Sequence, residues 1–240
     1  MTGRAAGAVV LVLALVFAGG ARAAGPVVVV DPGHDERANP RTEPIGPGSS
    51  TRKIKDGGGT HGVVSGTREA DLVLDVSLRL RSLLRRAGVS VVMTRTRTAG
   101  ASMGNVARAR IANDAGAALF LRVHADGHPS SAVRGAHILV PALRNGWTDD
   151  VYRTSRRAAS LVQPELVRAL GFPDRGISEH TDFTGFNWAD VPVILVELGF
   201  MTNPVEDRAL ERPAVRQRAA LGLCRGTLRF LGRAPSRCEV

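Results

Sequence analysis

The sequence predicts an α/β fold, a single domain with a mainly parallel twisted sheet and helices on both faces. Short apolar runs of strand length alternate with longer segments of helical periodicity, which is the pattern of successive βαβ units. No internal repeat, coiled-coil pattern or second domain interrupts this alternation. The strand-like runs are residues 27–31, 89–93, 118–124, 136–140 and 193–197. The helix-like segments are residues 67–87, 102–115 and 149–170, and two closely spaced helices are expected over residues 204–231.

Each type of segment is recognised by its side-chain pattern. Residues 27–31 begin with four valines, as expected for a strand buried on both faces. In residues 67–87, apolar side chains recur at steps of three and four, and Gly88 closes the segment as glycine does at many helix C-termini. The helix expected over residues 149–170 contains Pro164, which predicts a kink or a break at that position.

The N-terminus has the three parts of a secretory signal peptide. Arg4 precedes an apolar run from Ala5 to Ala18, and Ala21-Arg22-Ala23 follows as a small-residue cleavage site. The run is shorter than the ~20 residues that span a bilayer. We expect residues 1–23 to be cleaved. Residues 24–240 would then be one exported domain without a transmembrane segment, a monomer of the periplasm, cell wall or extracellular space.

Residues 36–64 do not fit the alternation of strands and helices. The segment is rich in glycine and proline and has neither a period of 2 nor one of 3.6. A connection of this length is uncommon inside a compact domain, where it is usually a functional loop or disordered. We expect a flap-like loop.

The chain is basic, with 32 lysines and arginines, 22 acidic residues and a formal net charge of +10. Such a charge suits nucleic acid, anionic lipid or anionic wall polymers. Export and the scarcity of stacking aromatic residues argue against nucleic acid, since Tyr152 is the only tyrosine. A solvated, arginine-rich surface explains the charge equally well.

The two cysteines, Cys224 and Cys238, both lie near the C-terminus and outside any metal-ligand pattern. In an exported protein a lone pair is a disulfide candidate, here one that would tie the tail to the last helix. Two unpaired thiols are the alternative.

Residues able to bind a metal or transfer protons stand at the ends of three predicted strands. His34 follows the first strand, His124 ends the third, and Glu197 ends the last. Ligands of parallel α/β sheets bind at the carboxyl ends of the strands, so these side chains should meet at one edge. Glu69 lies in the first turn of the helix that begins there. Two imidazoles and a carboxylate suit a catalytic Zn²⁺ and leave a fourth position for water.

Each of these residues also has a structural explanation. His34 follows Pro-Gly and fits a strand-exit turn, and Glu69 fits a helix N-terminus, where acids complement the dipole. His124 and Glu197 are harder to explain in this way, because a polar group after several apolar residues needs a partner. The residues alone therefore favour a metal hydrolase but leave structural roles open.

Four sequence blocks resemble the signature blocks of N-acetylmuramoyl-L-alanine amidases of the zinc-dependent Amidase_3 type. They are VVVVDPGHDE, SGTREADLVLDVSLRL, LRVHADG and VPVILVELGFMTNPVEDRAL, in the family's order, and together they span nearly the whole chain after the signal peptide. The resemblance implies a mainly parallel sheet of about six strands and a single Zn²⁺. It places the metal ligands at His34, Glu69 and His124 and the catalytic glutamate at Glu197.

The resemblance also implies an activity. Members of this family hydrolyse the amide bond between N-acetylmuramic acid and L-alanine of peptidoglycan, which is the work of cell-wall autolysins. Zn²⁺ lowers the pKa of a bound water towards ~7, and Glu197 would accept its proton and pass it to the leaving amine. The alternatives are another zinc hydrolase acting on wall polymers, such as a peptidase or deacetylase, and a non-catalytic wall-binding domain.

Substrate contacts are expected in the polar stretch before the last strand. This stretch holds Arg175, His180 and Asn187. Loops at the carboxyl edge of a sheet commonly carry binding groups, and the bidentate fork of an arginine suits a substrate carboxylate.

Overall fold

The computed structural model describes residues 2–3 and 25–239. The predicted signal peptide and its cleavage site lie almost entirely outside the described residues and remain predictions. None of the helices described is long and apolar enough to cross a membrane.

One sheet of six strands organises the described chain, as predicted. Its spatial order is β4-β1-β5-β8-β6-β7, and every neighbouring pair is parallel except β6 and β8. The strands are β1 (Val27–Pro32), β4 (Ser90–Met93), β5 (Leu119–Asp126), β6 (Ala136–Pro141), β7 (Asp174–His180) and β8 (Val193–Phe200). The carboxyl ends of β1, β5 and β8 therefore lie side by side at one edge.

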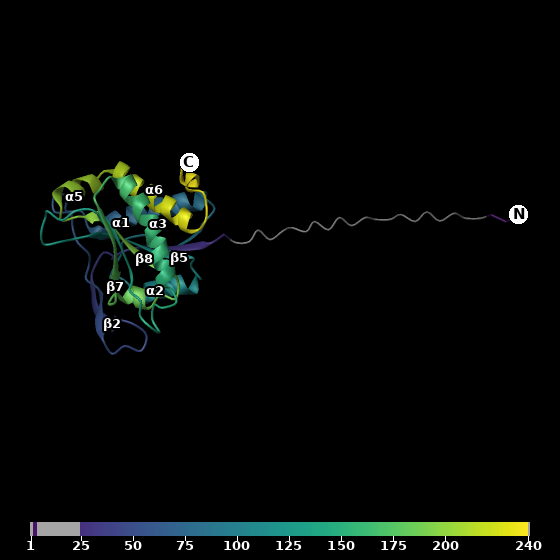
Figure 1. Ribbon diagram of the computed structural model, residues 1–240, viewed down its shortest axis with the longest axis horizontal. Helices are drawn as coiled ribbons and strands as arrows, with labels where there is room; N and C mark the ends of the chain where they lie inside the picture. Colours follow the sequence, from purple (N-terminus) through teal and green to yellow (C-terminus); the bar gives the residue numbers. More distant parts are fainter. Residues whose placement is uncertain (1, 4–24, 240) are drawn as a thin grey trace.

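Helices cover both faces of this sheet (Figure 1). On one face lie α1 (Glu69–Arg86), α3 (Tyr152–Leu170) and α6 (Pro213–Phe230), and on the other lie α2 (Asn105–Asp114) and α4 (Thr184–Asn187). The short α5 (Pro204–Leu210) leads into α6, and the 3-10 helix η1 (Pro235–Cys238) ends the described chain. Each face of the sheet is thus covered by its own layer of buried apolar side chains.

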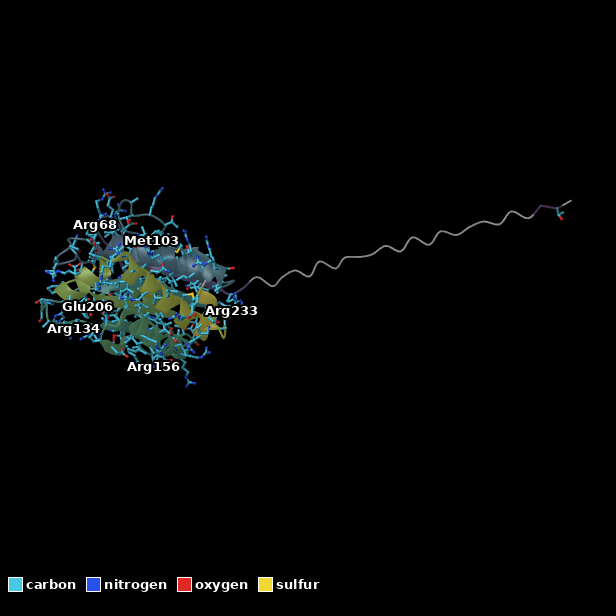
Figure 2. All side chains as sticks on the ribbon, turned by 90° about the horizontal axis from the view of Figure 1, so that it is seen from above. Arg68, Met103, Arg134, Arg156, Glu206 and Arg233 are labelled. Atoms are coloured by element: carbon cyan, nitrogen blue, oxygen red, sulfur yellow. A yellow bond between two sulfur atoms is a disulfide. The ribbon has the colours of Figure 1, made fainter. Side chains whose placement is uncertain are left out.

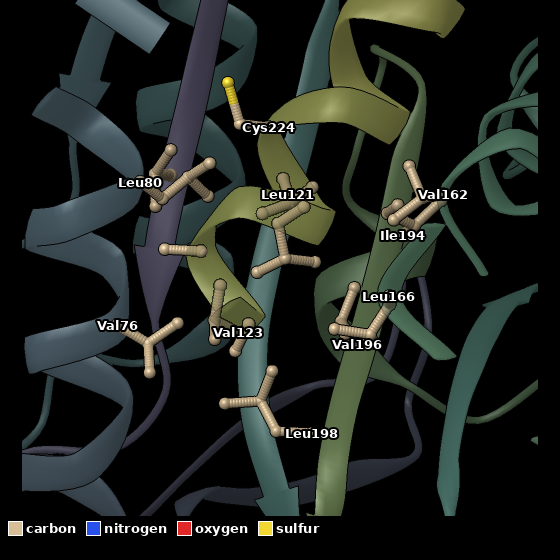
Figure 3. Packing of buried hydrophobic residues seen from close by; sticks show 14 of the residues in the cluster. Val76, Leu80, Leu121, Val123, Val162, Leu166, Ile194, Val196, Leu198 and Cys224 are labelled. Carbon is tan, nitrogen blue, oxygen red and sulfur yellow. The ribbon is translucent and has the colours of Figure 1, made fainter. Parts of the chain in front are cut away.

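The larger layer explains which strand residues face the site (Figure 3). Leu121 and Val123 of β5 are fully buried against the α1, α3 and α6 side of the sheet. Since successive strand residues point to opposite faces, Arg122 and His124 point to the α2 and α4 side. The same alternation places Glu197 of β8 on that side, paired in register with His124.

One expectation about secondary structure needs correction, and two elements were not expected. The expected helix at 149–170 begins at Tyr152 and continues through Pro164 without a break, because its buried face packs against the sheet and α6. Strand β7 and helix α4 were not predicted. The sequence of β7, DRGISEH, lacks apolar alternation because this edge strand is half exposed.

The 36–64 segment is also more ordered than its composition suggested. Strands β2 (Asn39–Pro44) and β3 (Arg52–Asp56) pair as a separate antiparallel hairpin. Their side chains are mostly polar and exposed, so no apolar period marks them. The hairpin is held instead by specific contacts. The indole of Trp188 donates to the Pro44 carbonyl at 2.9 Å, and Glu43 accepts from the backbone N–H of Asn105 at the start of α2.

Most of the basic side chains lie on the surface of the domain, and a buried disulfide joins its C-terminal elements. Arg68, Arg134, Arg156 and Arg233 lie on different sides of the molecule (Figure 2), so the basic charge is spread over the surface. Cys224 of α6 and Cys238 of η1 form a disulfide across a Cα–Cα distance of 6.1 Å, which joins the tail to the last helix.

Candidate metal centre

The three neighbouring strands bring the predicted site residues to one place. His34 follows β1, His124 lies in β5, and Glu197 lies in β8. Glu69 is the first residue of α1, which begins at the same edge. Four side chains that are far apart in sequence therefore meet at the carboxyl edge of the sheet.

Two imidazoles and one carboxylate converge closely. Oε1 of Glu69 lies 3.2 Å from Nε2 of His34 and 2.9 Å from Nδ1 of His124. One ligand atom from each of the three residues lies within 4.8 Å of the other two. The histidine rings meet edge to face, with centroids 4.9 Å apart. The backbone N–H groups of Thr60 and Ala125 also donate to Glu69.

Local backbone features make this convergence possible. A Cβ at Gly33 would lie only 2.3 Å from Cε1 of His124, so glycine is required where the first loop passes that ring. His34 adopts a positive φ of 56°, which few residues with a side chain take up. Gly59, at φ +75°, lies beside both His34 and Glu69. The chain therefore accepts an uncommon conformation to aim His34 into the site.

A buried ion cluster supports the loop from beneath. Asp31 is fully buried and accepts hydrogen bonds from Arg108 (2.5 Å), Arg122 (2.8 Å) and Thr94 (2.5 Å). The guanidinium of Arg108 also donates to the carbonyls of Pro32 and His34. The position of His34 therefore depends on this cluster.

The acid–base properties of the three converging residues follow from their contacts. Burial lowers the pKa of His34, but Asp56 and Glu69 outweigh it and raise that pKa to about 9. Burial raises the pKa of Glu69, yet the two histidines bring it well below its usual value. For His124 burial is the stronger effect and lowers its pKa. A negatively charged Glu69 thus faces the positively charged imidazole of His34.

The pKa of Glu197 is shifted in the opposite direction from that of Glu69. Burial raises its pKa well above the usual value, and the charges of Glu69 and Asp126 add to the effect, although Arg122 opposes it. Its Oε2 is buried and has no hydrogen-bond partner among the described residues. The carboxyl group of Glu197 therefore holds a proton more tightly than an exposed glutamate does.

The donor set fits a divalent metal ion. His124 has a buried Nε2 without a hydrogen-bond partner in the described chain. Neutral imidazoles and a carboxylate are the ligands that Zn²⁺ takes in catalytic sites. Asp56 accepts from Nδ1 of His34 at 2.5 Å, as acidic groups behind metal-ligating histidines do.

Two pockets meet at the candidate metal centre, and both are lined in part by His34, His124 and Glu197. One of them, a cleft of about 420 Å³, extends between the β2–β3 hairpin and α4. The other, of about 450 Å³, lies on the opposite side of the site and is bounded by Thr60, Gly127 and Thr202. The site therefore lies in a groove that is open on both sides.

The predicted substrate-contact residues are not in the lining of this groove. Arg175 of β7 stacks over Phe200, and His180 contacts Phe183. The buried amide of Asn187 donates to the Ile45 carbonyl at 2.9 Å and so anchors the hairpin. Substrate contact by these three residues stays a prediction.

Other residues, which sequence reasoning missed, do line the cleft. They include Lys53, Lys55 and Asp56 of the hairpin, Asn105 of α2, Arg122 of β5 and Asp182. The sequence carries one signal for the hairpin residues, because Lys53 and Lys55 are the only lysines in an arginine-rich chain.

Together, the fold and the site define an α/β protein with a candidate metal-hydrolase centre at the carboxyl edge of its sheet. Residues 28–229 match the family described as N-acetylmuramoyl-L-alanine amidase, and the chain belongs to that family. It is thus a hydrolase of peptidoglycan, as its sequence blocks implied.

Individual relatives agree with this assignment. The chain is 31% identical over 222 residues to the N-acetylmuramoyl-L-alanine amidase Rv3717 of Mycobacterium tuberculosis, covering 88% of each chain. Among solved structures it resembles the amidase Ami1 of Mycobacterium smegmatis, with 31% identity, a TM-score of 0.78 and coverage of 87% of this chain and 98% of that one. The apo form of Ami1 from Mycobacterium abscessus is similar at 28% identity, a TM-score of 0.78 and coverage of 87% and 99%.

Proposed function

We propose that this protein is a zinc-dependent amidase that hydrolyses the bond between N-acetylmuramic acid and the L-alanine of the stem peptide. His34, Glu69 and His124 would hold one Zn²⁺, and Glu197 would be the catalytic acid–base. The observation that carries the proposal is the convergence of three ligand atoms within 4.8 Å of one another, beside the unpaired carboxyl of Glu197.

The proposed roles follow from the surroundings of each side chain. Bound Zn²⁺ supplies Lewis acidity and lowers the pKa of water towards ~7. Glu197 accepts a proton from the attacking water and returns it to the leaving amine of alanine. Asp56 fixes the ring orientation of His34 through Nδ1. The groove, open on both sides of the site, suits a substrate that continues in both directions from the scissile bond.

The β2–β3 hairpin forms a wall of this groove in the proposal. Lys53, Ile54 and Lys55 of β3 line the cleft, and the ammonium of Lys53 pairs with Asp182 at 2.6 Å across it. Ile54 is half exposed although it is apolar, which suits contact with a bound polymer. The flap-like role expected for residues 36–64 would belong to this hairpin.

Export to the cell envelope is part of the same proposal. An enzyme that acts on peptidoglycan must reach it, and the signal-peptide pattern of residues 1–23 and the Cys224–Cys238 disulfide both favour export. The proposed location is the periplasm, the cell wall or the extracellular space.

Mass spectrometry of purified muropeptides, digested with and without a chelator, tests the activity and the metal together. We expect a free stem peptide that begins with L-alanine and a glycan without peptide, both absent after chelation and restored by Zn²⁺. Cleavage inside the peptide or loss of acetyl groups would instead identify the alternative peptidase or deacetylase. Products that chelation leaves unchanged would refute the metal dependence.

A further inference from the structure

Arg122 is a buried cation on the floor of the cleft, and the proposed chemistry does not use it. It lies two residues before His124 on β5, on the same face of the sheet, and is 3% exposed. Its Nε donates to Asp31 at 2.8 Å and its Nη2 donates to Asn105 at 2.7 Å. Its Nη1 has no hydrogen-bond partner among the described residues, while Arg122 lines the cleft.

The neighbouring helix leaves room for this free nitrogen. A Cβ at Gly185 of α4 would lie 2.2 Å from Nη1, closer than two such atoms can approach. Gly185 lines the same cleft. Any larger residue at position 185 would push the guanidinium from its place, so the packing of α4 fixes where Nη1 lies.

The charges around Arg122 do not balance. Arg122 and Arg108 are both nearly fully buried, and both are paired with the single carboxylate of Asp31. The hydrogen bonds that Arg122 donates go to Asp31 and Asn105 and not to Glu197. A buried positive charge without its own anion is costly, and an anion supplied by a ligand would relieve that cost.

The position of Arg122 relative to the site suggests which anion this is. Two strand residues span about 7 Å, which separates Arg122 from His124 along β5. In an extended peptide, the residue that follows alanine lies about one such step beyond the scissile bond. In peptidoglycan that residue is an acidic one whose α-carboxyl group is either free or amidated. The glycan side offers no carboxylate at this distance, because the lactyl carboxyl is itself the amide.

We propose that Nη1 of Arg122 binds the free carboxylate of the acidic residue next to L-alanine, so that the cleft takes the stem peptide and the enzyme prefers unamidated peptidoglycan. This inference rests on the proposed function. A carboxylate accepts a charge-assisted hydrogen bond from a guanidinium, whereas a carboxamide forms a weaker, neutral one. The expected preference in kcat/KM is about 10- to 100-fold.

The test uses two synthetic muramyl peptides that differ only in a carboxylate or a carboxamide at this position. Wild-type protein should cleave the carboxylate form about 10- to 100-fold better in kcat/KM, mainly through KM. Arg122→Gln and Gly185→Ala should bring the ratio near one. Gly185→Ala keeps the positive charge of Arg122 in the buried cluster, and its added Cβ would lie closest to Nη1, so it separates displacement of Nη1 from loss of the arginine. Arg86→Gln, which removes an exposed arginine at the end of α1, should leave the ratio unchanged.

A second readout does not depend on turnover. Calorimetry should show that the peptide of L-alanine and the acidic residue binds metal-stripped wild-type protein more tightly than its carboxamide does. The two should bind equally to the Gly185→Ala variant. Equal cleavage and equal binding of both forms by wild type would overturn the inference while the proposed function stands. Failure to cleave either substrate at the muramyl bond would instead refute the proposed function, and the binding comparison would still decide on Arg122.

Discussion

His34 and Asp56 form the contact that joins the hairpin to the candidate metal centre, with Nδ1 of His34 2.5 Å from Oδ1 of Asp56. The same oxygen accepts the backbone N–H of Gly58 at 2.8 Å, so the end of β3 is tied to the site from two directions. This arrangement fixes the orientation of the His34 ring and leaves Nε2 facing Glu69. The hairpin is therefore both a wall of the groove and a support for one proposed ligand.

Removing this support should weaken the metal site without dismantling it. In Asp56→Ala, Nδ1 of His34 loses its partner, and we expect zinc affinity to fall by about 10- to 100-fold, as for other carboxylates behind metal-ligating histidines. Titration with a competing chelator measures this. The matched control is Asp182→Asn, which breaks the pair with Lys53 on the other side of the cleft. Equal zinc affinity in wild type and Asp56→Ala would contradict the assigned role.

Substituting the proposed ligands themselves should reduce zinc binding more than Asp56→Ala does. His34→Ala and His124→Ala each remove one of three ligand atoms, so purified protein should contain little zinc and show no amidase activity. Metal analysis by mass spectrometry measures the zinc content, and His180→Ala serves as the histidine control because His180 is not among the three candidate ligands and its Nε2 lies 2.9 Å from the hydroxyl of Ser178 instead. Stoichiometric zinc in both ligand variants would refute the assignment.

The site residues also show which features of the fold and the site the sequence alone could predict. Apolar runs predicted the central strands, because a strand buried on both faces must be apolar along its length. Once β1, β5 and β8 are parallel neighbours, His34, His124 and Glu197 must share an edge. The hairpin was missed because its stability comes from single contacts such as Trp188 with Pro44, and these leave no periodic pattern. The role of Arg122 depends on burial and on Gly185, which one sequence does not reveal.

The Asp31 cluster should make the free energy of unfolding depend on pH in the acidic range. Burial alone would raise the pKa of Asp31, but Arg108, Arg122 and the Thr94 hydroxyl hold it well below its usual range. The folded state therefore binds the proton more weakly than the unfolded chain does. The resulting stability is fully present above about pH 4, the usual pKa of an aspartate, and is lost as pH falls below it.

Asp31→Asn isolates this effect. At pH 7 it should lower the free energy of unfolding by about 3–5 kcal/mol, since two buried guanidiniums lose their anion. Below pH 4 the difference from wild type should shrink, which urea unfolding across pH 2–7 would measure. Asp75→Asn removes a partly exposed partner of Arg79 and should cost less than about 1 kcal/mol. A constant difference between wild type and Asp31→Asn at every pH would contradict the cause given.

The disulfide should stabilise the C-terminal end of the domain. Cys224 and Cys238 are both buried and lie 14 positions apart. Closing such a loop contributes about 3 kcal/mol in the chain-entropy model, and less where the tail is already ordered by packing. Urea unfolding of wild type and of Cys224→Ser/Cys238→Ser should show this loss, and reductant should affect only wild type. Two reactive thiols in denatured, unreduced protein from an oxidising compartment would mean that the bond does not form.

Glu197 gives the most decisive prediction, because its surroundings favour proton transfer over a structural role. Residues 193–196 of β8 are buried, and the carboxyl that follows them lies beside His124 without a hydrogen bond to Oε2. Glu197→Gln keeps the size and polarity of the side chain but cannot accept a proton. It should therefore fold, bind zinc as wild type does, and hydrolyse muropeptides about 10²- to 10⁴-fold more slowly in kcat.

The measurement must separate chemistry from binding. Single-turnover digestion of muropeptides at saturating enzyme gives the rate of the chemical step, and metal analysis of the same samples shows whether zinc is retained. Glu197→Ala should also be inactive, but it opens space beside the proposed metal ligands, so its loss of activity would distinguish less sharply between a chemical and a structural cause. Glu179→Gln is the matched control, since Glu179 is a carboxylate of β7 that pairs with Arg156 outside the lining of the groove. Near wild-type hydrolysis by zinc-loaded Glu197→Gln would assign the proton transfer to another group, with Asp126 the next carboxylate along this edge to test.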